Sequence, residues 1–279
     1  MKLAESLLKV RFSIVSIFYK YIFQLMELNV NTQDTLIRED RVDRRPDYEL
    51  AAPQDRFIVQ SLKKHIDRVL STYANSGSSH PRALDIGCGC QPFRKNLEAL
   101  GYEYMSVDVN QNPEATVDIL CEIDRPLPSE LTKLARFDFI LCTEVMEHIV
   151  DWETSFSNFA KLLAPGGRLF ITCPHVYQLH EEPYDFWRAT PYALQYFGNK
   201  YGLNPIHQVN AGDSWDILGT VLANFHTLPV SRKLSDRILN RIVSYFQQWL
   251  LKLLLNGSLQ KSVSANGSFY QSNIVVFEK

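Results

Sequence analysis

The sequence lacks the cysteine and histidine spacings that bind structural metals. Its five cysteines are Cys88, Cys90, Cys121, Cys142 and Cys173. They form no C-x-x-C pair and have no matched histidine spacing, so we expect small packed side chains rather than a zinc site or a disulfide framework. We expect no metal. Reduced thiols are the ordinary state in the cytosol, and a cytoplasmic location is therefore expected.

The chain also lacks a large excess of charge of either sign. Its 29 Lys and Arg face 31 Asp and Glu, a formal net charge of −2. Global electrostatics therefore does not favour a nucleic acid, and no such partner is expected. With 279 residues, of which 46% are hydrophobic, the chain can bury a sizeable core, and we expect one elaborated α/β domain over residues 54–279.

No long uncharged hydrophobic run is present near the start of the sequence. Residues 3–28 are strongly apolar, but charged residues interrupt them, including Lys20 in mid-segment. A spanning helix needs about 20 nearly uncharged residues, and no small-residue cleavage site follows to indicate a secretory signal. Two interpretations stay open, a helix packed on the protein and an interfacial membrane helix. With the polar, highly charged linker that follows, this segment forms an N-terminal region of residues 1–53.

What the sequence does contain is an apolar run that ends in an acidic turn with two glycines. Asp85 closes the run, and Gly87 and Gly89 follow it. Glycines allow backbone angles closed to other residues and let a ligand approach the chain. Asp108 ends the next apolar run, where such folds place a partner for ribose hydroxyls. The two features together indicate a site for a nucleoside-like cofactor.

A third glycine is missing from this turn. Cys90, Gln91 and Pro92 follow Gly89, whereas a dinucleotide loop needs another glycine so that the pyrophosphate can lie against the start of the helix. A dinucleotide therefore fits poorly.

From residue 82 onward, short apolar runs alternate with helical stretches, which is typical of a parallel sheet with helices on both faces. We expect strands near residues 82–86, 103–107, 116–120, 137–142 and 168–173. Helical spacing of apolar residues predicts a further helix over residues 54–73.

Over about residues 83–197 the chain resembles the class I S-adenosylmethionine-dependent methyltransferases, of the type 11/23-like kind. Four segments carry the resemblance in order: the D-x-G-x-G loop at residues 85–89, the acid at Asp108, the strand and E-H pair at residues 137–148, and the helix, turn and strand at residues 162–171. The resemblance implies S-adenosyl-L-methionine as cofactor. It also implies a Rossmann-like, doubly wound, mostly parallel seven-stranded sheet, completed by strands near residues 205–210 and 271–278. Gln91 departs from the family, in which many members have a third glycine there.

The resemblance further implies where the cofactor would lie. Asp108 would accept hydrogen bonds from the ribose, and Glu122 and Ile123 would approach the adenine, although Glu122 could equally be a solvated loop acid. Thr143 and Glu144 would line the methyl-transfer channel. The amino-acid part and sugar would contact Asp85, Gly87, Cys88 and Gly89. The E-H pair, Glu147 and His148, is expected to fix its helix against a loop, and a catalytic role for His148 is the alternative.

Residues 173–191 form a segment dense in aromatic and titratable residues. Such loops seldom serve packing alone. Its H-x-x-P-x-D-F-W-R-x-T pattern resembles methyltransferases that accompany glycosyltransferases in glycan and polysaccharide assembly. A hydroxyl acceptor must lose a proton, and we expect His180 as the general base, with His175 second. Asp185 and Arg188 would orient a sugar or hold the loop shut, whereas a carboxylate or phosphate acceptor would give Arg188 the leading role.

These observations predict an S-adenosylmethionine-dependent methyltransferase that O-methylates a glycan or related polar metabolite. The alternatives are a methyltransferase for a lipophilic small molecule and a catalytically silent, membrane-associated binding or scaffold protein. The intact acidic turn argues against the last of these.

A second amphipathic segment lies in a helical insertion at about residues 228–262. Residues 234–255 place Ile238, Ile242, Phe246, Trp249 and Leu253 on one helical stripe. Basic residues on another face would suit anionic lipid, but the helix could also pack on its own domain. Peripheral membrane contact through residues 3–28 and 234–255 therefore stays open.

Overall fold

The computed structural model describes residues 55–74, 77–225, 234–264 and 267–279. The apolar helix and polar linker expected over residues 1–53 lie outside the described residues, as do residues 228–233 of the predicted insertion. Among the described residues, no helix combines the length and the apolar character that crossing a bilayer requires.

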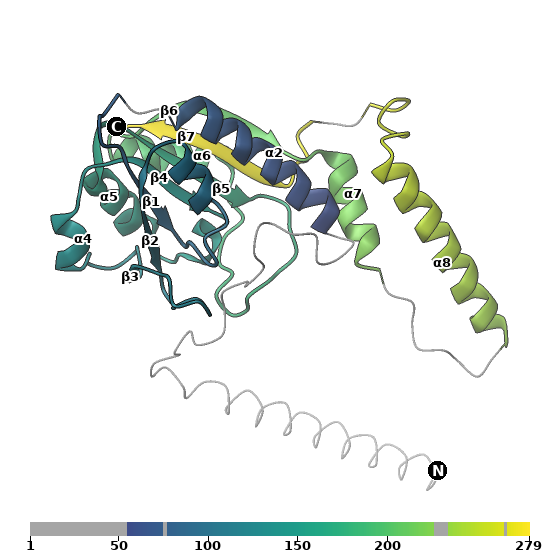
Figure 1. Ribbon diagram of the computed structural model, residues 1–279. Helices are drawn as coiled ribbons and strands as arrows, with labels where there is room; N and C mark the ends of the chain where they lie inside the picture. The colour runs from purple at the N-terminus through teal and green to yellow at the C-terminus, as the bar shows by residue number, and fades with distance from the viewer. Residues whose placement is uncertain (1–54, 75–76, 226–233, 265–266) are drawn as a thin grey trace, which may run out of the picture. The chain divides into compact units, whose positions relative to one another are not determined.

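A seven-stranded sheet with the order β3-β2-β1-β4-β5-β7-β6 forms the centre of the fold (Figure 1). The strands are β1 (Arg82–Ile86), β2 (Glu103–Asp108), β3 (Ile119–Leu120), β4 (Phe137–Thr143), β5 (Leu163–Pro174), β6 (Asn204–Ala211) and β7 (Ser272–Glu278). All pairings among β1 to β5 are parallel, and β7 runs antiparallel to both of its neighbours. The prediction of a Rossmann-like, mostly parallel seven-stranded sheet is confirmed.

Strand β3 is shorter than the predicted residues 116–120. In place of ladder bonds, the Asp118 carboxylate accepts hydrogen bonds from the backbone N–H of Ser106 at 2.8 Å and from its hydroxyl at 2.7 Å. The carbonyl of Thr116 accepts a bond from Gln91 Nε2 at 2.8 Å. Side chains therefore satisfy the backbone here, and regular strand pairing begins only at Ile119.

Helices cover both faces of the sheet. The helices of the described residues are α2 (Asp55–Tyr73), α3 (Arg94–Ala99), α4 (Ser129–Lys133), the 3-10 turn η2 (Met146–His148), α5 (Trp152–Leu162), α6 (Pro191–Lys200), α7 (Ser214–Ala223) and α8 (Leu234–Leu255), of which α8 packs on α7 rather than on the sheet. Because side chains of a strand alternate between faces, Leu84 belongs to the same buried cluster as Phe156 of α5, while its neighbour Ala83 belongs to the cluster that contains Ile66 of α2. The sheet is thus buried from both sides, which accounts for its nearly continuous apolar strands.

Side-chain caps mark the starts of three helices. The Asp151 side chain accepts the backbone N–H of Thr154 at the start of α5, and Asp213 and Asp216 form a capping box on α7. Thr190 caps α6, whose first residue is Pro191. These caps satisfy backbone donors that a helix leaves unpaired, so each loop enters its helix at a defined residue.

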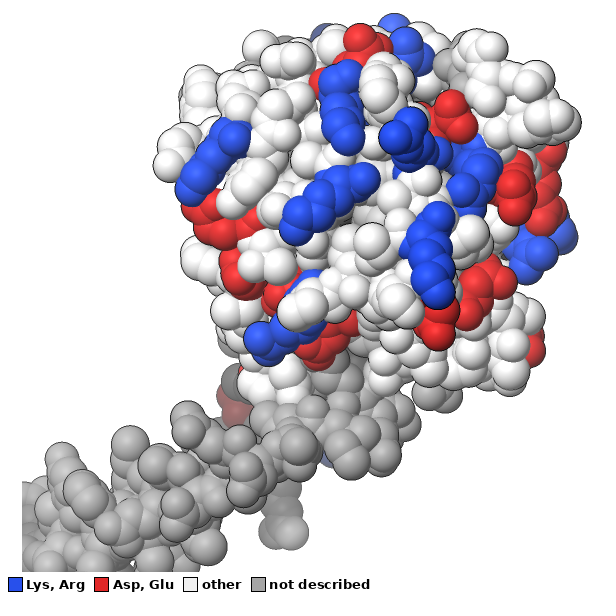
Figure 2. Space-filling view, turned by 90° about the vertical axis from the view of Figure 1, so that its left-hand side faces the viewer, with Lys and Arg blue, Asp and Glu red and all other residues white. Residues whose placement is uncertain are grey.

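Charges on the face drawn in Figure 2 are mixed. Basic side chains are spread over this face with acidic side chains among and around them. Exposed ion pairs of the described residues include Arg94 with Glu98 at 2.8 Å and Arg125 with Glu122 at 3.0 Å. Such surface pairs contribute roughly 0–1 kcal/mol each, so the stability of the fold rests on its two apolar clusters.

Candidate functional site

The strand order reverses between β1 and β4, and the candidate residues gather beyond the carboxyl ends of these strands. Open α/β sheets bind ligands at such a switch point. In the turn after β1, Gly87 has φ +68° and Gly89 has φ +51°. A Cβ on Gly87 would lie 2.3 Å from Cγ2 of Val145. Gly87 is therefore required both by its backbone angle and by the side chain that packs against it.

Gln91 stands where many family members have a third glycine, and it adopts a glycine-like backbone conformation. Its φ is +58°, in the left-handed region that glycine usually occupies. The side-chain amide of Gln91 donates to the Ser106 hydroxyl at 2.9 Å and to the carbonyl of Thr116 at 2.8 Å. These buried hydrogen bonds hold the residue in a conformation that would otherwise be disfavoured by roughly 1–2 kcal/mol. The Gln91 side chain thus fastens the turn to β2 and to the segment before β3.

Asp85 lies at the end of β1 and is almost completely buried. Its Oδ2 accepts a hydrogen bond of 2.7 Å from the Tyr104 hydroxyl. Burial and the nearby charge of Asp108 raise the pKa of Asp85 to about 7, while the bond from Tyr104 opposes this rise. A cationic ligand group beside Asp85 would favour its charged form.

Asp108 ties the turn to β2. Its Oδ2 accepts the backbone N–H of Gly89 at 2.9 Å, and its Oδ1 accepts that of Asn110 at 3.2 Å. The structure places this acid beside the glycine turn, as the sequence predicts.

The two residues expected near adenine lie directly after β3 but in different surroundings. Glu122 Oε2 pairs with Arg125 Nε at 3.0 Å on the surface. The side chain of Ile123 is buried, and its carbonyl accepts a bond of 2.8 Å from Asn158. Glu122 therefore has the surface pairing of a solvated loop acid, and Ile123 contributes to the core below it.

Thr143 ends β4, and Glu144 follows it with φ +52°. The backbone N–H of Glu144 donates to the hydroxyl and carbonyl oxygens of Thr172, and its Oε1 accepts a bond of 2.7 Å from the Ser272 hydroxyl. Desolvation and the neighbouring charge of Glu147 raise the pKa of Glu144 to about 8. A strained residue held by three side-chain and backbone bonds at the switch point is typical of a functional position.

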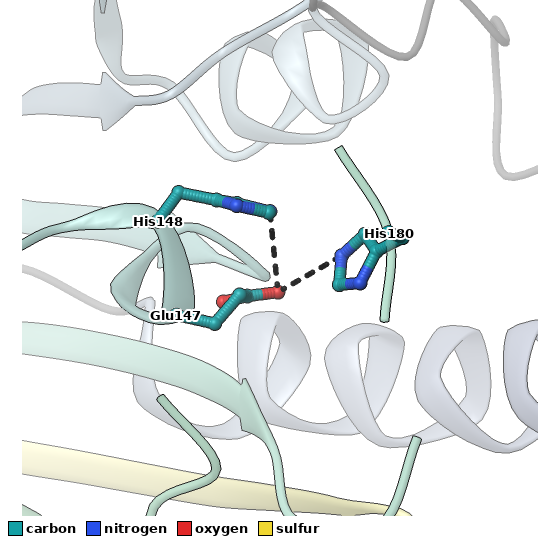
Figure 3. Close-up of side chains that lie close together, drawn as sticks. All are labelled: Glu147, His148 and His180. Carbon is teal, nitrogen blue, oxygen red and sulfur yellow. Dashed lines mark ion pairs between the residues drawn. The ribbon is translucent and has the colours of Figure 1, made fainter. Parts of the chain in front are cut away.

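Figure 3 shows a close group of titratable side chains formed by Glu147, His148 and His180. We call this group the Glu147 cluster. Nε2 of each histidine lies 3.7 Å from Oε1 of Glu147. Glu147 is fully buried, and within the described part of the chain neither of its carboxylate oxygens accepts a hydrogen bond. Burying a carboxylate without hydrogen bonds costs free energy. A buried group of this kind therefore calls for an explanation, and a functional role is one.

Second contacts orient both histidine rings. His148 Nδ1 lies 2.8 Å from the carbonyl oxygen of Tyr184, and His180 Nδ1 lies 3.2 Å from Oδ2 of Asp185. Both partners are acceptors, so each Nδ1 carries a proton and each Nε2 faces Glu147. Burial would lower the pKa of His180, but the Glu147 carboxylate, and Asp185 after it, outweigh burial and raise that pKa.

The sequence favoured a structural or supporting role for the pair of Glu147 and His148 over a catalytic one. That role exists, because the carbonyl of Glu147 accepts the backbone N–H groups of Phe186 and Trp187. These bonds join η2 to residues 173–191, which we call the acceptor loop. What the sequence did not show is that this loop brings His180 back against the Glu147 carboxylate. The E-H pair was the available signal, but its third member lies 32 residues after His148.

Arg188 and Asp185 fasten the acceptor loop internally. Nη1 and Nη2 of Arg188 donate to the two carboxylate oxygens of Asp185 at 2.5 and 2.6 Å. The remaining donors reach backbone carbonyls of Tyr177, Gln178 and Trp187. All five guanidinium N–H groups are therefore engaged within the loop. Burial opposes the charge of Asp185, yet Arg188 and His180 hold its pKa below the usual value.

His175 lies apart from the Glu147 cluster. Its ring stacks on Tyr270 with centroids 4.4 Å apart, and its Nδ1 lies 2.9 Å from the carbonyl oxygen of Ala189. These contacts join the first and last turns of the loop to the segment before β7. Of the four predicted catalytic residues, the structure thus groups His180, Asp185 and Arg188, and gives His175 different neighbours.

The geometry of the Glu147 cluster also suits a divalent cation. One ligand atom from each of its three residues lies within 4.8 Å of the others. Two imidazole nitrogens and a carboxylate form a common set of metal ligands, and each histidine has the hydrogen bond at Nδ1 that metal-binding histidines usually make. The expectation of no metal, drawn from the cysteines, did not consider this cluster.

Comparison with known proteins identifies the family. The family described as a methyltransferase domain matches residues 55–207. The chain belongs to this family. The prediction of a methyltransferase domain is confirmed, and S-adenosylmethionine as cofactor agrees with it.

Individual relatives cover shorter parts of this methyltransferase-domain chain. A ubiquinone biosynthesis O-methyltransferase from Bradyrhizobium diazoefficiens is 32% identical over 98 residues, which cover 33% of this chain and 39% of the relative. The mitochondrial ubiquinone biosynthesis O-methyltransferase of Homo sapiens is 29% identical over 132 residues, covering 40% of this chain and 35% of the relative. The chain thus spans less than half the length of these curated relatives.

Among solved structures, the crystal structure of the cyclase SpnF is similar with a TM-score of 0.50 and 13% sequence identity, covering 79% of this chain and 82% of that chain. At this identity the likeness shows the fold alone. A protein named as a cyclase on the same fold also illustrates that activity must be argued from the site.

Proposed function

We propose that the protein is an S-adenosylmethionine-dependent O-methyltransferase. The observation that carries this proposal is the glycine turn fastened to Asp108 at the β1/β4 switch point of a chain that belongs to a methyltransferase-domain family. The proposed cofactor contacts are Asp85, Gly87, Cys88, Gly89, Asp108, Glu122, Ile123, Thr143 and Glu144. Asp85 would lie near the positively charged methionine part, and Asp108 would accept the ribose hydroxyls.

His180 is the proposed general base. Its Nε2 would take the proton of the acceptor hydroxyl as the oxygen attacks the sulfonium methyl group, and the carbon–sulfur bond would break to release S-adenosylhomocysteine. The Glu147 carboxylate would stabilise the imidazolium that forms, and Asp185 would keep Nδ1 protonated. Positioned proton transfer of this kind contributes typically 10²–10⁴-fold to a rate. His175 remains the second choice, and its contacts favour a role in holding the loop.

A divalent cation at the Glu147 cluster is a second way in which the same residues could act. Glu147, His148 and His180 would hold it. Such a cation supplies Lewis acidity that lowers the pKa of a bound hydroxyl. The two alternatives differ in a direct test, since a base mechanism keeps its rate in the presence of a chelator and a metal-assisted one does not.

The engagement of Arg188 argues for a neutral acceptor. An anionic acceptor would need a free guanidinium, but all five N–H groups of Arg188 bond within the loop. A glycan or other polar metabolite is one acceptor class, and the loop pattern in the sequence supports it. A lipophilic hydroxyl compound is the other, supported by the curated relatives that act in ubiquinone biosynthesis and by the exposed side chains of Leu179 and Trp187. A cytoplasmic location stays part of the proposal, in keeping with five cysteines that form no disulfide.

Calorimetry with S-adenosylmethionine and S-adenosylhomocysteine tests the cofactor part of the proposal. We expect binding of both, and absence of binding at millimolar ligand would refute it. Release of S-adenosylhomocysteine in the presence of a panel of sugar hydroxyls and of lipophilic phenols would then identify the acceptor class. Binding without turnover on any acceptor would support a silent binding protein instead.

A further inference from the structure

Helix α8 (Leu234–Leu255) exposes most of its large apolar side chains. Ile242, Phe246 and Trp249 are between 55% and 60% exposed, and helical spacing places them on one face with Ile238. The large exposed side chains of α8 are Ile238, Leu239, Ile242, Val243, Tyr245, Phe246, Trp249 and Leu255. An exposed apolar face of this kind marks an interaction surface. We call it the α8 apolar face.

The opposite side of α8 packs on the domain through both polar and apolar residues, among them Leu251, which is half-buried, and Leu254, which is buried. Asn240, Ser244 and Gln247 are half-buried on this side. The side-chain amide of Gln247 donates to the carbonyls of Leu222 and Phe225 at 2.6 and 2.9 Å, which fastens α8 to the end of α7. The inward side of α8 thus combines polar anchors with leucines near its C-terminal end, and most of its large apolar side chains remain on the other side, contrary to the expectation for a helix that covers its own core.

Charge decides which occupant the α8 apolar face suits. Within α8 the charged residues are Asp236, Arg237, Arg241 and Lys252. Asp236 is half-buried, whereas the three basic side chains are exposed. At 100° per residue, Arg241 and Lys252 flank the apolar face beside Tyr245. A second copy of the chain would bring these cations together, while an anionic lipid surface would neutralise them.

We propose that α8 lies on the surface of an anionic membrane, with its apolar face among the acyl chains and its basic residues at the headgroups. Helices that bind in this way combine a polar face rich in Lys and Arg with an apolar face of aromatic and aliphatic residues. The helix lies outside residues 55–207, the part of the chain that matches the methyltransferase family. Membrane binding through α8 would thus be separate from the methyltransferase domain, and its test does not depend on the proposed reaction.

Flotation of the full chain tests this proposal. We expect the protein to float with vesicles of equal parts phosphatidylcholine and phosphatidylglycerol, and to stay unbound with phosphatidylcholine alone. The double variant Ile242→Ser/Trp249→Ser should reduce flotation at least tenfold, because it removes apolar side chains that carry insertion. Arg241→Gln/Lys252→Gln should also weaken binding, and raised salt should have the same effect on the wild type. Tyr196→Ser, at an equally exposed aromatic residue of α6, is the matched control and should float like the wild type.

Three results would overturn the proposal. Unchanged flotation of the Ile242→Ser/Trp249→Ser variant would assign membrane binding to another segment, such as residues 3–28. Equal binding to neutral and anionic vesicles would remove the role of the basic residues. A wild-type dimer that becomes monomeric in the Ile242→Ser/Trp249→Ser variant, with no flotation of either, would assign the α8 apolar face to self-association.

Discussion

Replacement of Gly87 by alanine tests the central turn, because two separate effects act at this residue. The left-handed φ of +68° disfavours any residue with a Cβ by roughly 1–2 kcal/mol. The new Cβ would also lie 2.3 Å from Cγ2 of Val145 and 3.0 Å from its Cγ1. Val145 is β-branched and stiff at χ1, so the overlap adds about 1–3 kcal/mol, as overpacking does elsewhere. We expect Gly87→Ala to lower the free energy of unfolding by about 2–5 kcal/mol in total.

Gly166 provides the matched control. Its φ is +75°, but a Cβ there would meet no atom within 4 Å. Gly166→Ala should therefore show the backbone effect alone, roughly 1–2 kcal/mol. The difference between the two variants measures the contact with Val145, and it should largely disappear in a Val145→Ala background, giving a coupling energy of about 1–3 kcal/mol.

Urea unfolding of the four variants and the wild type measures these energies, and calorimetry with S-adenosylmethionine reports the effect on the turn. We expect cofactor affinity to fall in Gly87→Ala and to be unchanged in Gly166→Ala. Equal destabilisation by both glycine substitutions, or no coupling to Val145, would show that the turn does not pack against the segment after β4 as the structure describes.

Three further predictions concern the site. Asp108→Ala should weaken cofactor binding, since it removes the acceptor for the backbone N–H of Gly89 and for the ribose; unchanged affinity in calorimetry would contradict this assignment. His180→Ala should lower kcat by about 10²–10⁴-fold with cofactor affinity retained. Glu147→Gln removes the charge that raises the pKa of His180. It should move the acid limb of the kcat/KM profile to lower pH, because His180 then stays neutral at lower pH. A pH profile identical to that of the wild type would exclude Glu147 as the partner of the base. Arg188→Lys should cost about 1–3 kcal/mol of stability and raise KM for the acceptor, because lysine cannot donate to both oxygens of Asp185; a wild-type KM would show that the loop does not depend on this pair.

Several parts of the fold could be read from the sequence because local patterns determine them. The alternation of apolar runs and helical stretches predicted the strands, and the bounds of α8 agree with the predicted residues 234–255. Residues 116–118 did not join β3, because hydrogen bonds from Ser106 and Gln91 satisfy that segment. Those partners lie 10 to 25 residues away, and a pattern of hydrophobicity carries no information about them.

The sequence by itself determined the part of the site that would bind the methyl donor. The turn at Asp85, Gly87 and Gly89 and the acid at Asp108 are local features of two parallel strands, and parallel strands bring their carboxyl ends to one edge of the sheet. Only the tertiary structure decided the rest. The path of the acceptor loop placed His180 against the buried Glu147 and closed Arg188 onto Asp185, and the packing of α8 through Gln247 left its apolar face outside. Each of these depends on which side of an element is buried, and that is settled by contacts between distant parts of the chain rather than by neighbouring residues.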